Sequence, residues 1–144
     1  MADNAEPLSH LLPYAAPDIT GTRLFLQVVR RMGVGGLNDA HAANMLIGVF
    51  GLSFRRPLIL TRALMAELAR ASTCSIMIAP SCCCRMTLAE SMLVRAVAES
   101  QDKPHEAHRT LCRLCLIEQG IGVLSSAQAV ASAFADLGRP IKTS

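Results

Sequence analysis

The segment Ser81-Cys82-Cys83-Cys84-Arg85-Met86-Thr87 is the feature around which the chain is arranged. Three adjacent thiols follow the β-branched stretch at residues 76–78, and the strong helix start Thr87-Leu88-Ala89-Glu90 comes directly after them. Thr87 with Glu90 three residues later is the pattern of a capping box, in which each side chain accepts a hydrogen bond from the other residue's amide. The sequence therefore predicts a tight, thiol-bearing bend between an extended fragment and a capped helix.

Beyond this bend, the pattern predicts helices on both sides. Towards the N-terminus we expect helices over residues 21–32, 38–51 and 57–71, because apolar side chains recur there at helical spacing. Arg30 falls outside the apolar stripe of the first. The second is apolar on all sides after Asn44, so we expect it to be central and buried. Towards the C-terminus we expect a helix from Pro104 to Gly120, and a last one with a second capping box, Ser125 with Gln128, closed by Gly138.

The predicted fold class is mostly α, a compact bundle of about six helices forming a single domain over residues 19–141. Residues 1–18, which hold three prolines, read as a flexible lead-in. The apolar fragments 76–79 and 121–124 either pair as a minimal two-stranded parallel ribbon or remain unpaired loops. In the ribbon, two helix N-termini would meet beside Arg85 and favour an anion, with Thr87, Ser125 and Ser126 as the other candidate residues.

Composition places this chain among compact soluble domains. Its 144 residues are 51% hydrophobic, with four Phe, one Tyr and no Trp, so the core must be aliphatic. No signal peptide or membrane span is visible, because the most apolar stretch, residues 45–54, is about half of the roughly 20 residues that a bilayer needs. We therefore expect a cytoplasmic protein with no membrane contact, in which the six cysteines are thiols or ligands rather than disulfides.

Charge is concentrated in the first half of the chain. The net charge is +3, and residues 19–71 carry seven arginines against two acidic residues. A positive face suggests nucleic acid, but aromatic residues for base stacking are nearly absent and the predicted second helix is too apolar to face phosphates. The sequence thus argues against nucleic acid as a partner.

The cysteines and histidines offer two candidate sites for metal or thiol chemistry. Cys82, Cys83 and Cys84 lie beside Arg85 and before a helix start, where a thiol can be activated or can bind zinc or an iron–sulfur cluster. The alternative is an inert structural loop. A second pattern is the stripe at helical spacing formed by His105, His108, Cys112 and Cys115. Its alternative is core packing, with Cys115 on the buried face, His108 and Cys112 at its edge, and His105 exposed.

Two further polar residues have simple interpretations. His41 shares a helix face with Asn44 and Gly48, which indicates either a pocket lining or a close helix crossing with a satisfied histidine. Glu67 lies among apolar residues and has Arg70 one turn away as its expected partner. No second carboxylate at matched spacing suggests acid–base chemistry, and no nucleophile elbow, P-loop or dinucleotide fingerprint is present.

Several segments together resemble a known family. They are Gly36-Leu37-Asn38-Asp39-Ala40-His41-Ala42-Ala43, Arg55-Arg56-Pro57-Leu58, the 82–87 run, and the 125–130 and 135–138 segments. The chain resembles, over about residues 20–140, a family of short uncharacterised bacterial proteins defined as a domain of unknown function. This resemblance implies no activity, cofactor or partner.

Two functional hypotheses follow, from different classes. In the first, a non-enzymatic helical protein acts through contacts with a protein partner or as a homo-oligomer. In the second, the loop of Cys82, Cys83 and Cys84 holds zinc or an iron–sulfur centre or is a redox-sensitive thiol, with Cys112, Cys115, His105 or His108 as helpers. A small-molecule enzyme with an anion pocket at Arg85 is a weaker third.

Overall fold

The computed structural model describes residue 12 and residues 14–143. In this part of the chain, six α-helices and one two-stranded antiparallel sheet follow in the order β1 (Tyr14–Ala15), α2 (Thr20–Gly35), α3 (Ala40–Phe50), the 3-10 helix η2 (Gly51–Ser53), α4 (Arg55–Ala71), β2 (Arg85–Met86), α5 (Leu88–Glu99), α6 (Pro104–Cys115) and α7 (Ile121–Asp136). The predicted fold class is confirmed. Of the predicted lead-in, residues 1–11 and 13 lie outside the described residues, whereas Tyr14–Ala15 form β1.

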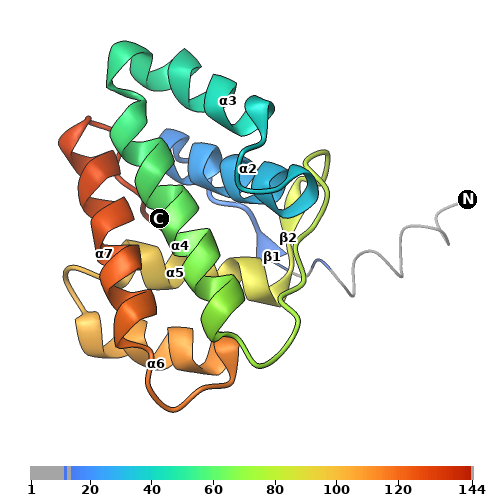
Figure 1. The fold of residues 1–144 in the computed structure, drawn as a ribbon, viewed down its shortest axis with the longest axis vertical. Helices are drawn as coiled ribbons and strands as arrows, with labels where there is room; N and C mark the ends of the chain where they lie inside the picture. The colour runs from blue at the N-terminus through green and yellow to red at the C-terminus, as the bar shows by residue number, and fades with distance from the viewer. Residues whose placement is uncertain (1–11, 13, 144) are drawn as a thin grey trace, which may run out of the picture.

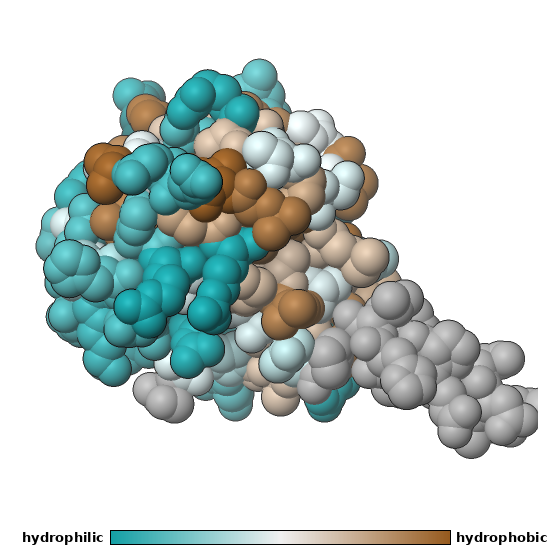
Figure 2. All heavy atoms as spheres, turned by 90° about the horizontal axis from the view of Figure 1, so that it is seen from below, coloured by the Kyte–Doolittle hydropathy of each residue, from teal (hydrophilic) through white to brown (hydrophobic). Residues whose placement is uncertain are grey.

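Helix pairs form the body of the molecule (Figure 1). The closest packing joins α4 to α7, α5 to α6, and α2 to α3, and one cluster of buried side chains draws members from all six helices. In this cluster the ring of Phe134 meets Phe25 and Phe50 edge to face, with centroids 6.1 Å and 5.4 Å away. Each such ring pair adds about 0.5–1.5 kcal/mol to the gain from burial. The core is otherwise aliphatic, as the composition predicts. On the face drawn in Figure 2, hydrophilic residues cover much of the surface and apolar residues form smaller patches between them.

The expected position of α3 is wrong. Only Ala42 and Leu46 of this helix are buried, while Ile47 and Val49 are 42% and 38% exposed. Figure 1 shows α3 along the upper edge of the molecule, packed on α2, with its outer side uncovered. The apolar sequence was interpreted as burial on all sides, but a helix at an edge has a neighbour on one side only.

Neither alternative for the two apolar fragments holds for both of them. Residues 121–124 form the first turn of α7, which excludes the parallel ribbon, whereas residues 75–79 belong to neither a helix nor a strand. The two strands are instead β1 and β2, which pair antiparallel with Tyr14 opposite Met86 and Ala15 opposite Arg85. Four apolar residues do not distinguish a strand from a helix turn, and here the helix continues for three more turns.

Helix ends explain the remaining differences from the prediction. α6 ends at Cys115 rather than near Gly120, because Leu116 adopts the left-handed conformation with φ of 53°. α7 therefore begins at Ile121, and Ser125 and Ser126 lie within it, so the predicted second capping box is wrong. Its C-terminal end is as predicted: Gly138 has φ of 77°, and the amides of Gly138 and Arg139 donate to Ala135 and Phe134 as in a Schellman motif.

The start of α2 is held by the C-terminal segment. Thr22 Oγ1 donates to the Lys142 carbonyl at 2.6 Å and accepts the Lys142 amide at 2.8 Å. Gly21 faces the same segment so closely that a Cβ atom there would lie 2.2 Å from the Arg139 carbonyl oxygen. The segment after α7 is therefore part of the packed fold. Among the described residues, no helix has the length and apolar character needed to cross a bilayer.

Candidate functional site

A buried ion pair lies beneath the cysteine run. Arg30 of α2 donates from Nε to Glu90 Oε2 at 2.8 Å and from Nη2 to Glu90 Oε1 at 3.1 Å, and the two side chains are 1% and 0% exposed. Removing two charges from water costs several kcal/mol per ion, so such a pair persists only when its remaining donors and acceptors are also satisfied. The surrounding contacts show how this is achieved.

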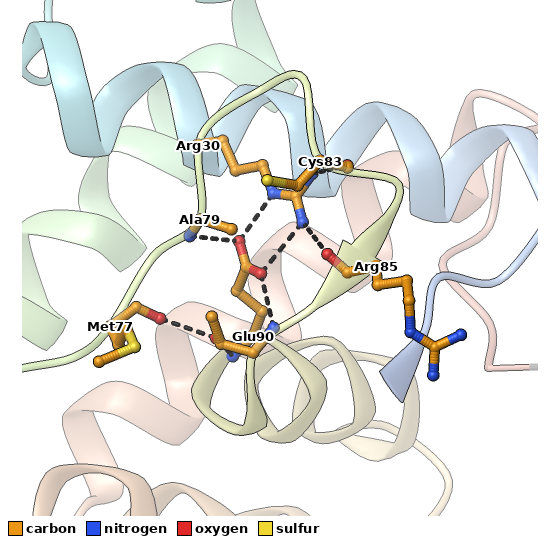
Figure 3. Close-up of polar contacts among 7 residues, drawn as sticks. Arg30, Met77, Ala79, Cys83, Arg85 and Glu90 are labelled. Carbon is orange, nitrogen blue, oxygen red and sulfur yellow. Dashed lines mark hydrogen bonds and ion pairs between the residues drawn. The ribbon is translucent and has the colours of Figure 1, made fainter. Parts of the chain in front are cut away.

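The rest of the Arg30 guanidinium binds the backbone of the thiol-bearing loop, residues 80–84, and of β2. Nη1 donates to the carbonyl of Cys83 at 2.6 Å, and Nη2 donates to the carbonyl of Arg85 at 2.8 Å (Figure 3). Both acceptors are main-chain oxygens, so the loop is held by its backbone and its sulfur atoms are left for other contacts. We call residues 80–84 the thiol loop.

Glu90 closes the thiol loop from the other side. Its carboxylate accepts the amide of Thr87 at 2.9 Å and that of Ala79 at 3.2 Å, which lie on either side of the loop (Figure 3). Thr87 Oγ1 accepts the Glu90 amide at 3.0 Å and donates to the Met77 carbonyl at 2.8 Å. The predicted capping box of α5 is thus confirmed, and its glutamate is also the counterion of Arg30.

The three thiols differ in their surroundings. Cys82 and Cys84 are exposed, whereas Cys83 is half-buried, and the Cys83 amide donates to the Pro80 carbonyl at 3.1 Å across the bend. Burial raises the pKa of Cys83 above its ordinary value, and the neighbouring Cys82 raises it further, while Arg30 opposes these effects. Cys83 is therefore not the activated, low-pKa thiol that its place before a helix suggests.

A pocket of about 470 Å³ opens beside the thiol loop. All three cysteines line it, together with residues of α2 and of the segment that precedes α2, among them Arg23, Gln27 and Asp18. Pockets of this volume are in the usual range for small-molecule sites. The pocket thus brings exposed thiols together with an exposed arginine and an exposed aspartate.

The other anion candidates lie apart from this pocket. The Arg85 side chain points away from Cys83 (Figure 3), and its Nε donates to the Leu12 carbonyl at 2.8 Å. Thr87 is used in the cap of α5, and His41 is exposed on α3. Ser125 and Ser126 are within α7, whose N-terminal end lies near Glu67 and His108 rather than near the thiol loop.

The histidine and cysteine stripe of α6 is arranged as its packing interpretation predicts. Cys115 is fully buried and burial raises its pKa, whereas His105 is exposed. Cys112 Sγ lies 3.5 Å from His108 Nε2, which accepts the amide of Gly120 at 3.1 Å, just before α7. Among the described residues, no group of three or more His, Cys, Asp or Glu side chains is placed to share a metal ion.

The pairing of Glu67 with Arg70 is confirmed, but sequence reasoning missed the role of Arg30. The helical pattern placed Arg30 outside the apolar stripe of its helix, whereas Arg30 is fully buried. A sign of its burial was the number of apolar residues near it on the helix. Val29 precedes Arg30 directly, Leu26 lies one turn earlier, and both are buried. An arginine within such a face must find a buried partner, and the glutamate of a neighbouring capping box is a ready one.

The fold and site define a mostly helical domain in which a buried ion pair holds a thiol-bearing loop by its backbone. The chain belongs to a family of unknown function, DUF6628, whose model matches residues 2–133. The resemblance to an uncharacterised family is thereby confirmed. Neither the search of curated proteins nor that of solved structures gives a match.

Proposed function

We propose that this protein is non-enzymatic and acts through protein–protein contacts made by the uncovered side of α3. This surface, the α3 face, consists of exposed residues of α3 and of the η2 turn that follows it: Ala40, His41, Asn44, Ile47 and Gly48 of α3, and Leu52 of η2. Its main support is that these exposed residues lie in a stretch, residues 40–54, that contains no Asp, Glu, Lys or Arg. Exposed sides of helices ordinarily carry charged residues, and interface cores are depleted of them.

Gly48 gives independent support to the α3 face. It is exposed in the last turn of α3, and glycine within a helix costs up to about 0.5–1 kcal/mol relative to alanine. Among the described residues, no atom outside the helix's own backbone lies within 4 Å of the position that a Cβ would take, so packing in this part of the chain does not require glycine there. A second surface that approaches the α3 backbone closely would require it.

The partner we propose is a second copy of the same chain. In a two-fold symmetric contact each face meets itself, so a charged face would bring like charges together. The α3 face has no formal charge when His41 is neutral. The side chains of Ile47 and Leu52 project from it, and Gly48 between them has no side chain, so a side chain of one copy could pack over Gly48 of the other. Leu52 is 99% exposed, which is costly for a leucine unless something covers it.

Light scattering after size-exclusion chromatography tests this proposal. We expect the wild-type chain to run at about twice its 15.4 kDa mass. Leu52→Lys should give a monomer, whereas Leu116→Lys, which changes an equally apolar, 65% exposed residue after α6, should leave the dimer intact. Gly48→Ala should weaken the dimer while it raises the thermal stability of the monomer. A wild-type monomer at all concentrations would refute the proposal.

The thiol loop supports a second candidate function, a redox-sensitive thiol. The supporting observation is that Arg30 and Glu90 hold the loop by its backbone while all three thiols line one pocket. The alternative is that the thiol loop binds zinc or an iron–sulfur centre. Metal analysis of anaerobically purified protein tests this alternative, and the control is a variant in which Cys82, Cys83 and Cys84 are replaced by serine. Stoichiometric metal that disappears in this variant would favour the metal alternative.

We propose a cytoplasmic location for either function. All six cysteines are free thiols in the structure, and a reducing compartment keeps thiols in this state. Thiol titration of protein from rapidly acid-quenched cells tests this proposal. Six titratable thiols per chain are expected, and a stable disulfide would contradict the location.

A further inference from the structure

We propose that Cys82 is an S-thiolation site for low-molecular-weight disulfides that carry carboxylates, bound in the pocket between α2 and the thiol loop. This inference rests on the second candidate function, the redox-sensitive thiol, and names the class of molecule with which the thiol reacts. Three features of the site carry it: a pocket of suitable volume, an arginine that can exchange its partner, and an exposed cysteine next to a half-buried one in the pocket lining.

The pocket holds two cations with different roles. Arg30 is only 1% exposed, and four of its five N–H groups bind Glu90 and the carbonyls of Cys83 and Arg85, so it is poorly accessible to a ligand. Arg23 lies two helical turns before Arg30 on α2, and its side chain is 67% exposed. Arg23 is therefore the pocket residue that can bind an incoming anion.

The present partner of Arg23 is easily replaced. Arg23 Nη1 donates to Asp18 Oδ1 at 3.0 Å, and Asp18 is 94% exposed, so water screens the pair strongly. Ion pairs of this kind contribute little to stability. A ligand carboxylate can take the place of the Asp18 carboxylate with the same charge, and arginine binds carboxylates through two parallel hydrogen bonds. Asp18 is then the competitor, and its removal should strengthen anion binding.

Cys82 and Cys83 have complementary roles. Cys82 is exposed and lines the pocket, while the neighbouring Cys83 is half-buried. Burial, and then the neighbouring Cys82, raise the pKa of Cys83, which makes Cys83 the less reactive of the two. Arg30 holds the backbone of this segment by the Cys83 carbonyl, so the exposed Cys82 is kept at the edge of the pocket.

The reaction is thiol–disulfide exchange. The Cys82 thiolate attacks one sulfur of the disulfide R–S–S–R, a new bond forms between Cys82 Sγ and that sulfur, and the original S–S bond breaks. The second sulfur leaves as the thiolate RS⁻ and takes a proton from water. Cys82 is oxidised to a mixed disulfide and one R–S group is reduced, so the electrons balance without a further reagent.

Three disulfides of different charge test the proposal: glutathione disulfide, which carries carboxylates, hydroxyethyl disulfide, which is neutral, and cystamine, which is cationic. Mixed-disulfide formation is followed by intact mass and assigned by tandem mass spectrometry. Rates are divided by those of the same chain in urea, which removes differences in intrinsic reactivity. We expect folded wild-type protein to favour glutathione disulfide over cystamine by roughly fivefold, the effect of one partly screened charge pair.

Matched variants separate the roles of the residues. Arg23→Gln should abolish the preference for glutathione disulfide over cystamine, and Asp18→Asn should increase that preference. Cys82→Ser should remove the adduct, and Cys84→Ser should retain it. Equal normalised rates in the wild type, or an adduct on another cysteine, would overturn this inference while leaving a reactive thiol in place. No adduct with any of the three disulfides would overturn the redox-sensitive thiol as well.

Discussion

The buried pair of Arg30 and Glu90 makes a strong prediction for stability. In Glu90→Gln the Arg30 guanidinium remains buried without a counterion, because both side chains are at most 1% exposed. Removing one partner of a buried pair costs about 3–5 kcal/mol. Natural domains have total stabilities of about 5–15 kcal/mol, so this variant should lose a large part of its margin. Arg30→Met should cost a similar amount, because it leaves the Glu90 carboxylate buried.

A double-mutant cycle measures the interaction itself. Urea unfolding is followed by circular dichroism for the wild type, the two single variants and the double variant Arg30→Met with Glu90→Gln. We expect the double variant to lose less than the sum of the single losses, with a coupling energy of at least about 2 kcal/mol, within the range for directly contacting residues. The double variant should still be less stable than wild type, because the Cys83 and Arg85 carbonyls lose their donor.

An exposed pair provides the control. Arg56 of α4 and Asp136 of α7 form an ion pair in which the side chains are 52% and 57% exposed, so Arg56→Met and Asp136→Asn should change stability little. Hydrogen exchange should show increased opening of residues 79–87 in Glu90→Gln before the remaining helices open. Single-variant losses below about 1 kcal/mol, or additivity within about 0.5 kcal/mol, would refute the assignment of this pair as the anchor of the thiol loop.

Three further predictions concern other sites. Thr61 Oγ1 is buried with no hydrogen-bond partner among the described residues, so the isosteric Thr61→Val should raise the free energy of unfolding by about 1 kcal/mol in urea titration; a loss would show that the hydroxyl is satisfied. Gly21→Ala would place a Cβ 2.2 Å from the Arg139 carbonyl oxygen, so thermal unfolding should show a loss of about 1–3 kcal/mol or more. Gly36→Ala is the comparison: its Cβ would have no neighbour within 4 Å among the described residues, so any loss there comes from the φ of 90° and not from a clash. Burial alone would raise the pKa of Asp39, but hydrogen bonds from the Ala42 amide and from Arg31 hold it below its ordinary value; its stabilisation is therefore present above about pH 4 and lost as pH falls through the folded-state pKa. Unfolding curves of wild type and Asp39→Asn should thus converge in acid, and a constant difference from pH 7 to pH 2 would contradict this.

Much of the helical fold could be predicted from the sequence because its signals are local. The capping box at Thr87, the proline at the start of α6 and the glycine after α7 each act within one helical turn, and all three mark real helix boundaries. The burial of Cys115 could also be predicted, because a small thiol on an apolar stripe packs as a hydrophobe.

The arrangement of helices in space could not be predicted in the same way. The position of α3 at an edge depends on how many neighbours reach it, and no local pattern counts them. The short β1–β2 pair joins residues that are 70 and 72 positions apart, and each strand contributes two residues, which is too little for a periodic signal. The thiol loop was correctly placed before a capped helix, but its anchor, Arg30, is 53 residues from Cys83.

The distance along the chain between Arg30 and Glu90 has a consequence for synthesis. The two residues are 60 positions apart, and the thiol loop lies between them. At about 5–20 residues per second, a ribosome needs roughly 3–12 s to produce that interval. During this time the Arg30 guanidinium of the nascent α2 has no Glu90 carboxylate to bind. The three cysteines of the thiol loop are made just before Glu90, so they are anchored only after the ion pair forms. A translational pause shortly after α5 has left the exit tunnel would let Arg30 and Glu90 pair before the rest of the chain is made.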